Sequence, residues 1–327
     1  MTMHSKFAPA TTACFLALFC CFHTAGAASV RVGVADISQS QLSLFVARDK
    51  GYYRQEGLDV ELILMPGAIA NQALIAGNVE YTTVPTAGLT AALQGAPLRV
   101  LFTTYHKAMF WLYSRPEIRD VKDLVGKKVA VSSIAAAADS ALREFLARYG
   151  LEAGRDIVVL SIGVGSTRFI ALQNGTVDAA MLTTPWNFKA PEAGLRELVS
   201  FVKQDLIRLN GSIVVREALL QSDRAGVEKF IRATEKGFLS TLHNRSETAA
   251  ILARNMRITD DLGAKIYDIA RPAMTPDGIL SDELQKKALA PMLERLGKRD
   301  APLLDKFFNF SLARKARGEL DATGWKP

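Results

Sequence analysis

The chain has 327 residues, of which 49% are hydrophobic and 22% are charged, and its formal net charge is +7. This length is enough for two modest hydrophobic cores. Basic and acidic residues are interspersed, and the basic residues form no stripe with aromatic neighbours, which argues against a nucleic-acid partner.

Residues 1–27 predict a cleaved export signal. Lys6 is the only lysine or arginine among them, an apolar run follows over residues 12–22, and small residues lead up to a predicted cleavage after Ala27. We therefore expect the mature protein in the periplasm. A lipoprotein anchored through Cys20 or Cys21 is the alternative, but neither cysteine follows the small residue that lipid attachment requires.

The positions of the cysteines limit the chemistry of the mature chain. All three, Cys14, Cys20 and Cys21, lie inside the predicted signal, so the mature chain can form neither a disulfide nor a thiolate metal site. No second apolar run is long enough to span a bilayer. We expect no metal site and no cofactor.

Strands and helices alternate along the first two thirds of the chain, which predicts mostly parallel sheets with helical crossovers. In a first unit, strands are predicted at residues 30–35, 58–64, 79–83 and 98–104, with helices at 41–50, 69–76 and 87–94. In a second unit, strands are predicted at 127–131, 157–161, 178–182 and 197–202, with helices at 137–149 and 168–174. Amphipathic helices follow at 225–244, 247–254, 260–270 and 282–296, and we expect them to cover the first unit.

The two units share a sequence pattern. The stretches ALIAGNVEYTTVPTA and ALQNGTVDAAMLTTPW each close a short helix on a glycine, Gly77 or Gly175, and continue into a strand and a polar loop. Residues 110–114 and 212–216 correspond as candidate return strands that follow a crossing between the units. This duplication predicts an α/β protein of two lobes with a ligand cleft between them.

The duplication also predicts the domain boundaries. Lobe 1 takes residues 28–107 and 207–327, and lobe 2 takes residues 108–206. Because the chain crosses between the lobes twice, a two-stranded hinge is expected near residues 104–109 and 206–211. Bending at these crossings would close the lobes around a ligand.

Short motifs along the chain resemble those of one family of binding proteins. They are FVARDKGYYRQEGLDVE at residues 45–61, DLVGKKVAV at 123–131 and GTVDAA at 175–180. In this order they resemble the periplasmic substrate-binding proteins of ABC importers for nitrate, sulfonates and taurine, and for thiamine-pyrimidine precursors. The resemblance implies the two-lobed type II periplasmic-binding-protein fold, with helices flanking a mostly parallel sheet in each lobe. It also implies a monomer whose partner is an ABC permease in the inner membrane.

Enzyme signatures are missing from the sequence. The patterns HExxH, GxSxG, GxxxxGK[ST] and GxGxxG do not occur, and only His106 and His243 lie outside the predicted signal. The same fold hosts a pyrimidine-forming enzyme in eukaryotes, but that enzyme depends on a cysteine-rich segment that this chain lacks. We therefore expect a binding protein, with a secreted hydrolase as the remaining enzyme class.

Ligands of open α/β sheets bind beyond the carboxyl ends of the strands. In this chain those ends carry small polar residues, whose hydroxyls and neighbouring helix N-termini suit an anion. The candidate ligand-binding residues are Asp36, Ser38, Gln39, Gly67, Ala68 and Thr86 in lobe 1, and Ser132, Ser133, Ser166, Thr167, Thr184 and Trp186 in lobe 2. Local capping of helices is the alternative role for the serines and threonines.

Three side chains suggest how a ligand would be oriented. Asp36 can receive an ammonium group, Trp186 can pack against an apolar part, and Arg168 either pairs with an acidic ligand or is solvated. The predicted function is capture of a small anionic or zwitterionic solute, such as a sulfonate, nitrate or a carboxylate, and its delivery to the permease. The alternatives are a sensor that presents its ligand to a membrane receptor, and a binder of a pyrimidine or thiamine precursor.

Overall fold

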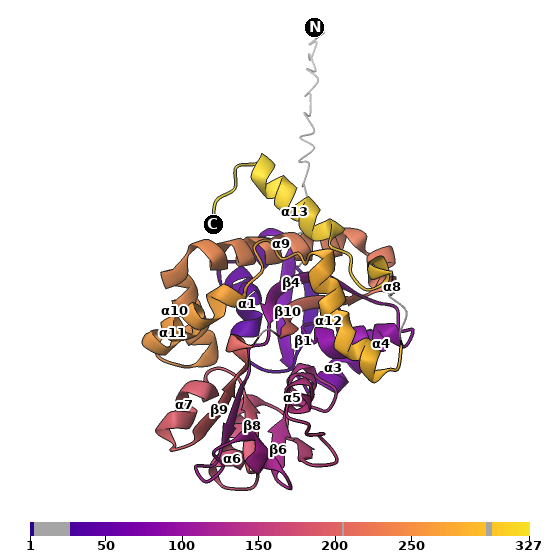
Figure 1. Ribbon diagram of the computed structural model, residues 1–327. Coiled ribbons are helices and arrows are strands. Elements are labelled where there is room, and N and C mark those ends of the chain that lie inside the picture. The colour runs from indigo at the N-terminus through magenta and orange to yellow at the C-terminus, as the bar shows by residue number, and fades with distance from the viewer. Residues whose placement is uncertain (3–26, 205, 299–302) are drawn as a thin grey trace.

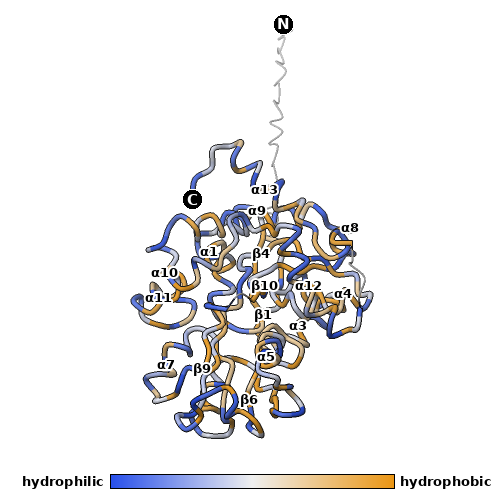
Figure 2. Tube along the Cα trace, in the orientation of Figure 1, coloured by the Kyte–Doolittle hydropathy of each residue, from blue (hydrophilic) through white to orange (hydrophobic). Residues whose placement is uncertain are grey.

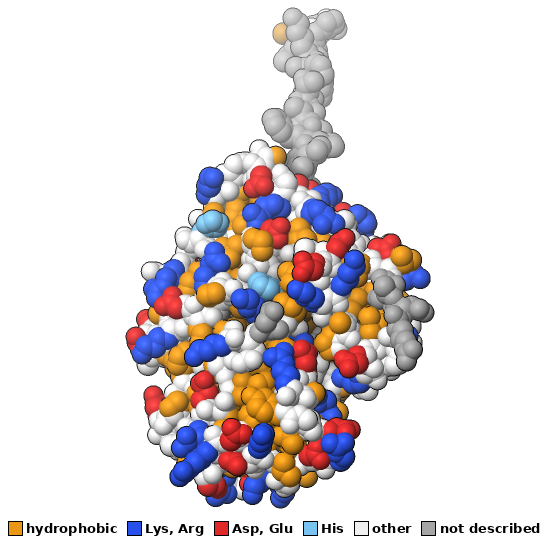
Figure 3. Space-filling model, viewed as in Figure 1, with side chains coloured by type: hydrophobic (Ala, Val, Ile, Leu, Met, Phe, Trp, Pro, Cys, Tyr) orange, Lys and Arg blue, Asp and Glu red, His pale blue; other side chains and the backbone are white. Residues whose placement is uncertain are grey.

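The computed structural model describes residues 1–2, 27–204, 206–298 and 303–327. The described residues from 27 onward form two lobes (Figure 1). Residues 3–26 hold most of the predicted export signal and all three cysteines, and they lie outside the described residues. In the described part, no helix is both long and apolar enough to cross a membrane. Charged side chains of both signs are scattered over the face shown in Figure 3, as their interspersed sequence positions suggest.

Lobe 1 is built on a five-stranded sheet with the order β2-β1-β3-β10-β4. The strands are β1 (Ala28–Val34), β2 (Leu58–Leu64), β3 (Tyr81–Thr82), β4 (Leu98–Lys107) and β10 (Ile207–Arg216). β1 pairs in parallel with β2 and β3, whereas β10 runs antiparallel to β3 and β4. Branched and aliphatic residues favour these strands, and Val32 and Val34 are fully buried between the flanking helices.

Lobe 2 repeats this topology with the order β7-β6-β8-β5-β9. Its strands are β5 (Trp111–Ser114), β6 (Lys128–Val131), β7 (Val158–Ser161), β8 (Ala179–Leu182) and β9 (Arg196–Ser200). β6 is parallel to β7 and β8, and β5 is antiparallel to β8 and β9. In each lobe the antiparallel strand is the one that follows the crossing from the other lobe. The two-lobed α/β fold predicted from the duplication is therefore confirmed.

The two crossings between the lobes lie side by side. β4 pairs with β10 as far as Lys107, which stands opposite Ile207. Just beyond that pair, the Ala108 N–H donates a hydrogen bond of 3.2 Å to the Leu206 carbonyl. Adjacent crossings are the geometry that a hinge needs, because few residues then have to change conformation. Movement at these residues stays a prediction.

Helices flank both sheets. Those of the first unit are α1 (Leu42–Asp49), α2 (Tyr52–Gln55), α3 (Gly67–Ala76) and α4 (Pro85–Leu93). Lobe 2 has α5 (Ala137–Ala147), α6 (Gly165–Gln173) and α7 (Trp186–Glu192). The C-terminal part has α8 (Glu217–Ser222), α9 (Arg224–His243), α10 (Arg245–Met256), α11 (Asp260–Ala270), α12 (Asp282–Arg295) and α13 (Ser311–Ala322). These C-terminal helices lie around lobe 1 (Figure 1).

Short 3₁₀ turns complete the chain. They are η1 (Gln39–Gln41), η2 (Val121–Leu124), η3 (Phe201–Lys203), η4 (Arg271–Ala273) and η5 (Leu304–Lys306). The turn η1 joins β1 to α1, and it belongs to the loop that faces lobe 2.

Close packing of α9 against α1 anchors the part of lobe 1 that faces lobe 2. A Cβ atom on Gly237 of α9 would lie only 2.3 Å from the backbone oxygen of Ser43 in α1. Phe230 and Phe238 of α9 are fully buried, and Phe230 stacks on Tyr53 with ring centroids 5.3 Å apart. Since α1 starts directly after η1, this packing holds the loop after β1 in place.

The sequence prediction missed α2, α7, α8 and α13. The helices α2, α7 and α8 have four, seven and six residues, which is too short for a clear helical period, and α7 also contains Pro191. In contrast, α13 buries Leu312, Ala313, Ala316 and Leu320, a helical spacing that the sequence does carry. Figure 2 shows hydrophobic and hydrophilic residues interspersed along the trace of the helices.

Candidate functional site

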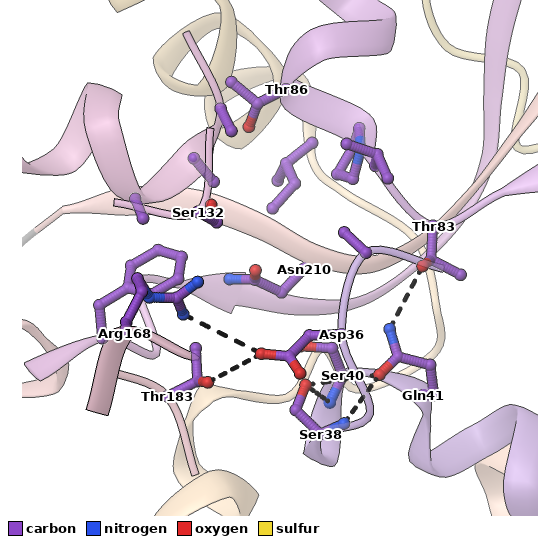
Figure 4. A pocket seen from close by; sticks show the side chains of 18 residues that line it. Asp36, Ser38, Ser40, Gln41, Thr83, Thr86, Ser132, Arg168, Thr183 and Asn210 are labelled. Carbon is purple, nitrogen blue, oxygen red and sulfur yellow. Dashed lines mark hydrogen bonds and ion pairs between the residues drawn. The ribbon is translucent and has the colours of Figure 1, made fainter. Parts of the chain in front are cut away.

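A cavity of about 90 Å³ lies between the lobes. Lobe 1 lines it with the polar side chains of Asp36, Ser38, Ser40, Gln41, Thr83 and Thr86, and Asn210 of β10 adds an amide (Figure 4). Lobe 2 contributes the polar side chains of Ser132, Arg168 and Thr183, and the apolar wall includes Phe110 and the alanines at 136–138. Most of the polar residues follow the carboxyl ends of β1, β3, β6 and β8, where an open α/β sheet is expected to bind its ligand.

The loop after β1 is held by its own side chains. Ser38 caps η1: its Oγ accepts a hydrogen bond of 3.3 Å from the Ser40 N–H, and its own N–H donates to Gln41 Oε1 at 3.2 Å. The Gln41 amide also donates to Thr83 Oγ1 at 3.2 Å, which ties this loop to the loop after β3. Ser38 therefore caps a helical turn, and its role in ligand binding stays a prediction.

Asp36 of lobe 1 is bound mainly by lobe 2. Its Oδ2 accepts hydrogen bonds from Thr183 Oγ1 at 3.1 Å and from the Gly165 N–H at 3.3 Å, and it lies 4.0 Å from Nη2 of Arg168. Its Oδ1 accepts from the Ile37 N–H at 2.9 Å. Burial raises the pKa of Asp36, while the positive charge of Arg168 and the Thr183 hydrogen bond act in the opposite direction.

Arg168 is buried, so the alternative that it is solvated is wrong. Only 1% of its surface is exposed, its Nε donates to the Met181 carbonyl at 2.7 Å, and its Nη1 donates to the Gly163 carbonyl. These two backbone contacts fix the guanidinium, so that Nη2 is directed at Asp36 (Figure 4). Burial lowers the pKa of Arg168 and the charge of Asp36 opposes this, but an arginine stays protonated because its ordinary pKa is so high.

The structure brings four of the predicted site residues together around the cavity: Asp36, Ser38, Thr86 and Ser132. The hydroxyls of Thr86 and Ser132 come from opposite lobes, and neither makes a side-chain hydrogen bond to another described residue. A role of these two hydroxyls in ligand binding stays a prediction.

The other eight predicted residues lie outside this lining: Gln39, Gly67, Ala68, Ser133, Ser166, Thr167, Thr184 and Trp186. Some of them form the contact between the lobes instead. Thr184 Oγ1 is hydrogen-bonded to Gln39 Oε1 across the lobes, and a Cβ atom on Gly67 would lie 3.6 Å from Ser133 Oγ.

The remaining predicted residues serve lobe 2 or face solvent. Thr167 donates to the carbonyls of Ile162 at 2.7 Å and Val164 at 2.8 Å, a local bond at the start of α6. Trp186 packs against Phe169 with ring centroids 5.2 Å apart, and the amino group of Lys189 lies over its ring. Ala68 is exposed and Ser166 is partly exposed. A role of any of these residues in ligand binding stays a prediction.

The sequence prediction did not include Ser40, Gln41, Thr83, Thr183, Phe110 and Asn210 among the site residues. Thr83 and Thr183 directly follow the equivalent strands β3 and β8 of the two lobes, so the internal duplication is a signal that marks both. Phe110 and Asn210 lie next to the crossings, and only the pairing of β4 with β10 brings that region to the cavity. Within the described residues, no group of three or more histidine, cysteine, aspartate or glutamate side chains is arranged to hold a metal ion.

Known proteins with related sequences or structures include several binding proteins. The riboflavin-binding protein RibY of Chloroflexus aurantiacus is 28% identical over 217 residues, which are 62% of this chain and 59% of RibY. The alkanesulfonate-binding protein SsuA of Xanthomonas axonopodis pv. citri, bound to MOPS, has a TM-score of 0.68 at 20% identity, covering 88% of this chain and 97% of its own. The periplasmic nitrate-binding protein NrtA of Synechocystis PCC 6803 has a TM-score of 0.72 at 14% identity, covering 90% of this chain and 89% of NrtA.

These structural similarities, at low sequence identity, establish the fold alone. The desulfurization enzyme DSZB shares it too, with a TM-score of 0.62 at 14% identity over 89% of this chain and 99% of that protein. The fold therefore does not separate binding from catalysis. The NMT1/THI5-like family model matches residues 39–248, which is more than half of the chain. Together with the two-lobed fold, this match shows that the chain belongs to the NMT1/THI5-like family.

Proposed function

We propose that this chain is a periplasmic solute-binding protein, which captures a small anionic or zwitterionic solute between its lobes and delivers it to an ABC permease. The observation that carries the proposal is the cavity between the lobes. One buried cation, one acid and several hydroxyls line it, and both lobes contribute to it. A solute held by both lobes would stabilise their closure, which is how a binding protein signals that it is loaded.

The charges in the lining favour a zwitterion. Asp36 and Arg168 are the charged residues among the described residues of the lining, and they lie 4.0 Å apart at their closest atoms. The guanidinium can pair with a sulfonate, a carboxylate or a similar acidic group, and Asp36 can accept an ammonium group from the same molecule. A lone anion would meet the negative charge of Asp36, and a lone cation would meet the positive charge of Arg168. The hydroxyls of Thr86 and Ser132 can bond the acidic oxygens.

A flat heterocycle is the second candidate ligand. Its support is the similarity to a relative whose name records riboflavin binding, together with the earlier alternative of a pyrimidine or thiamine precursor. A cavity of about 90 Å³ with Phe110 as its aromatic wall is small for a ring system of that size. Such a ligand would require the lobes to separate further. A sensor that presents its ligand to a receptor would use the same cavity and differ only in its membrane partner.

A thermal-shift screen tests this proposal. The mature protein is heated with sulfonates, amino-sulfonates, nitrate, carboxylates, amino acids, pyrimidines and riboflavin in turn. A ligand at 100 times its Kd should add about 2.7 kcal/mol of apparent stability. Binding of a zwitterion more tightly than of nitrate or riboflavin is the expected result. If no compound in any of these classes raises the melting temperature, solute capture in this cavity is contradicted.

Calorimetry with the best ligand then locates the site. Thr86→Ala and Ser132→Ala should each weaken binding by roughly 10- to 150-fold, because each removes a hydrogen bond to a charged group worth about 1.5–3 kcal/mol. Ser29→Ala is the matched control, since Ser29 is an exposed serine on β1 outside the cavity lining. Unchanged affinity in both site variants would mean that the ligand binds elsewhere.

A further inference from the structure

One oxygen of Asp36 sits where an oxygen of an acidic ligand would be expected. Three donors of lobe 2 converge on Oδ2: the Thr183 hydroxyl at 3.1 Å, the Gly165 N–H at 3.3 Å and the Arg168 guanidinium at 4.0 Å. The other carboxylate oxygen is bound within its own loop, by the Ile37 N–H. Figure 4 shows Asp36 reaching across the cavity toward Arg168 and Thr183.

Contacts within lobe 2 position the donors that surround Oδ2 of Asp36. The Met181 and Gly163 carbonyls hold the Arg168 guanidinium, and only 2% of that side chain is exposed. Gly165 is the first residue of the nine-residue helix α6, so its N–H is one of the donors that a helix leaves free. A side chain is not tolerated there, because a Cβ atom on Gly165 would lie 2.6 Å from Cδ1 of Trp186. In this structure the N–H of Gly165 donates to Oδ2 of Asp36.

We propose that Gly165, Arg168 and Thr183 form an anion seat on lobe 2, and that Asp36 occupies it as an internal competitor until the acidic group of a ligand displaces it. The inference rests on the proposed function in that it concerns the same cavity. It adds that the seat binds the acidic group of the solute, and that Asp36 sets which solutes gain access. A simple anion has to displace the carboxylate and then stay beside its negative charge. A zwitterion displaces it and offers an ammonium group in return.

The charge on Asp36 is held at a cost in free energy, which makes displacement feasible. Burial raises the pKa of this carboxyl, so part of its attraction to Arg168 is offset by lost hydration. Asp36→Asn keeps the shape of the side chain and removes the competing charge. Because a negative charge about 4 Å from a bound anion is strongly repulsive in a partly buried site, this change should raise the affinity for a simple anion by about tenfold or more.

Calorimetric titration of the mature protein with inorganic sulfate and with methanesulfonate tests the inference. We expect Asp36→Asn to bind both anions about tenfold or more tightly than the parent. Asp59→Asn is the matched control, because Asp59 is an exposed acid on β2 and its loss changes the net charge equally. In the Asp36→Asn background, adding Thr183→Val should remove the gain, and adding Thr183→Ser, which keeps the hydroxyl, should retain it.

Three results would overturn the anion seat. The first is that Asp36→Asn binds the anions no more tightly than the parent. The second is that Asp59→Asn gains as much anion affinity as Asp36→Asn. The third is that Asp36→Asn keeps its gain in anion affinity after Thr183→Val is added. Different results would contradict the anion seat and the proposed function. If the parent binds a solute from the screen but Asp36→Asn gains no affinity for sulfate or methanesulfonate, only the seat is wrong. If Asp36→Asn gains that affinity while the parent binds no solute, the seat stands and the proposed function is wrong.

Discussion

Substitution of Gly237 by alanine tests whether the contact between α9 and α1 supports the fold. A Cβ atom at this position would lie 2.3 Å from the Ser43 carbonyl oxygen, 2.7 Å from the Ala47 Cβ and 2.8 Å from the Ala47 nitrogen. Two of these three atoms belong to the backbone and the third is a short side chain, so none can rotate away. The two helices would have to separate by roughly 1 Å to restore an ordinary carbon–oxygen contact.

Two opposing terms set the size of the effect. Overpacking in a close contact typically costs about 1–3 kcal/mol. Alanine is better than glycine in a helix by about 1 kcal/mol, which offsets part of that cost. Because the nearest atom is a backbone oxygen at 2.3 Å, the overpacking cost falls in the upper part of this range, about 2–3 kcal/mol. We therefore expect Gly237→Ala to lower the free energy of unfolding by about 1–2 kcal/mol.

A second glycine in a helix isolates the packing term. Gly318 lies on the exposed face of α13, and a Cβ atom there would meet no atom within 4 Å. Gly318→Ala should therefore gain up to about 1 kcal/mol from helix propensity alone. Denaturant unfolding followed by tryptophan fluorescence measures both variants against the parent. If Gly237→Ala is as stable as the parent, or changes as Gly318→Ala does, the close contact does not limit this position.

Three further predictions concern pH, motion and maturation. Burial raises the pKa of Glu235 from its ordinary 4.5 to about 7, although the positive charge of Arg317 acts in the opposite direction. Between these two pH values the folded protein binds more protons than the unfolded chain, so its stability falls as the pH rises. Between pH 4 and 8, the free energy of unfolding of Glu235→Gln should fall by roughly 3 kcal/mol less than that of the parent. The same pH dependence in both proteins would contradict this prediction. Saturating solute should shrink the radius of gyration in small-angle scattering, whereas an identical profile would speak against hinge closure. Intact-mass analysis of periplasmic protein should show the loss of residues 1–27, and a lipid-modified N-terminal cysteine would refute this cleavage.

Local sequence signals were sufficient for most of the secondary structure and for the two lobes. Helix ends at Gly77 and Gly175 appear in the structure at positive φ of 83° and 72°, where a side chain would be strained. Hydrophobic periodicity located most of the strands and the longer helices, because it depends only on neighbours along the chain. The repeat of the same elements in the same order predicted two sheets with one topology. The short helix α7 was missed because seven residues with an internal proline carry little periodicity.

The site was predicted only in part, since strand ends identify loops but not the side chains that face a cavity. Thr183 bonds Asp36 in the cavity, while its neighbour Thr184 bonds Gln39 in the contact between the lobes. The side chains of adjacent residues at the end of a strand point in different directions. A prediction that is wrong by one position therefore selects a residue of the contact between the lobes in place of a residue of the cavity.

The sequence by itself determined the family motifs, the alternation of strands and helices, and the chemistry of hydroxyls and opposite charges available at the strand ends. All of these depend on residues close together in the chain. Only the tertiary structure decided that Arg168 is buried rather than solvated, and that Asp36 reaches it from the other lobe. Those facts depend on how two lobes, joined through adjacent crossings, are placed against each other. That placement is a sum of many long-range contacts, which no local pattern encodes.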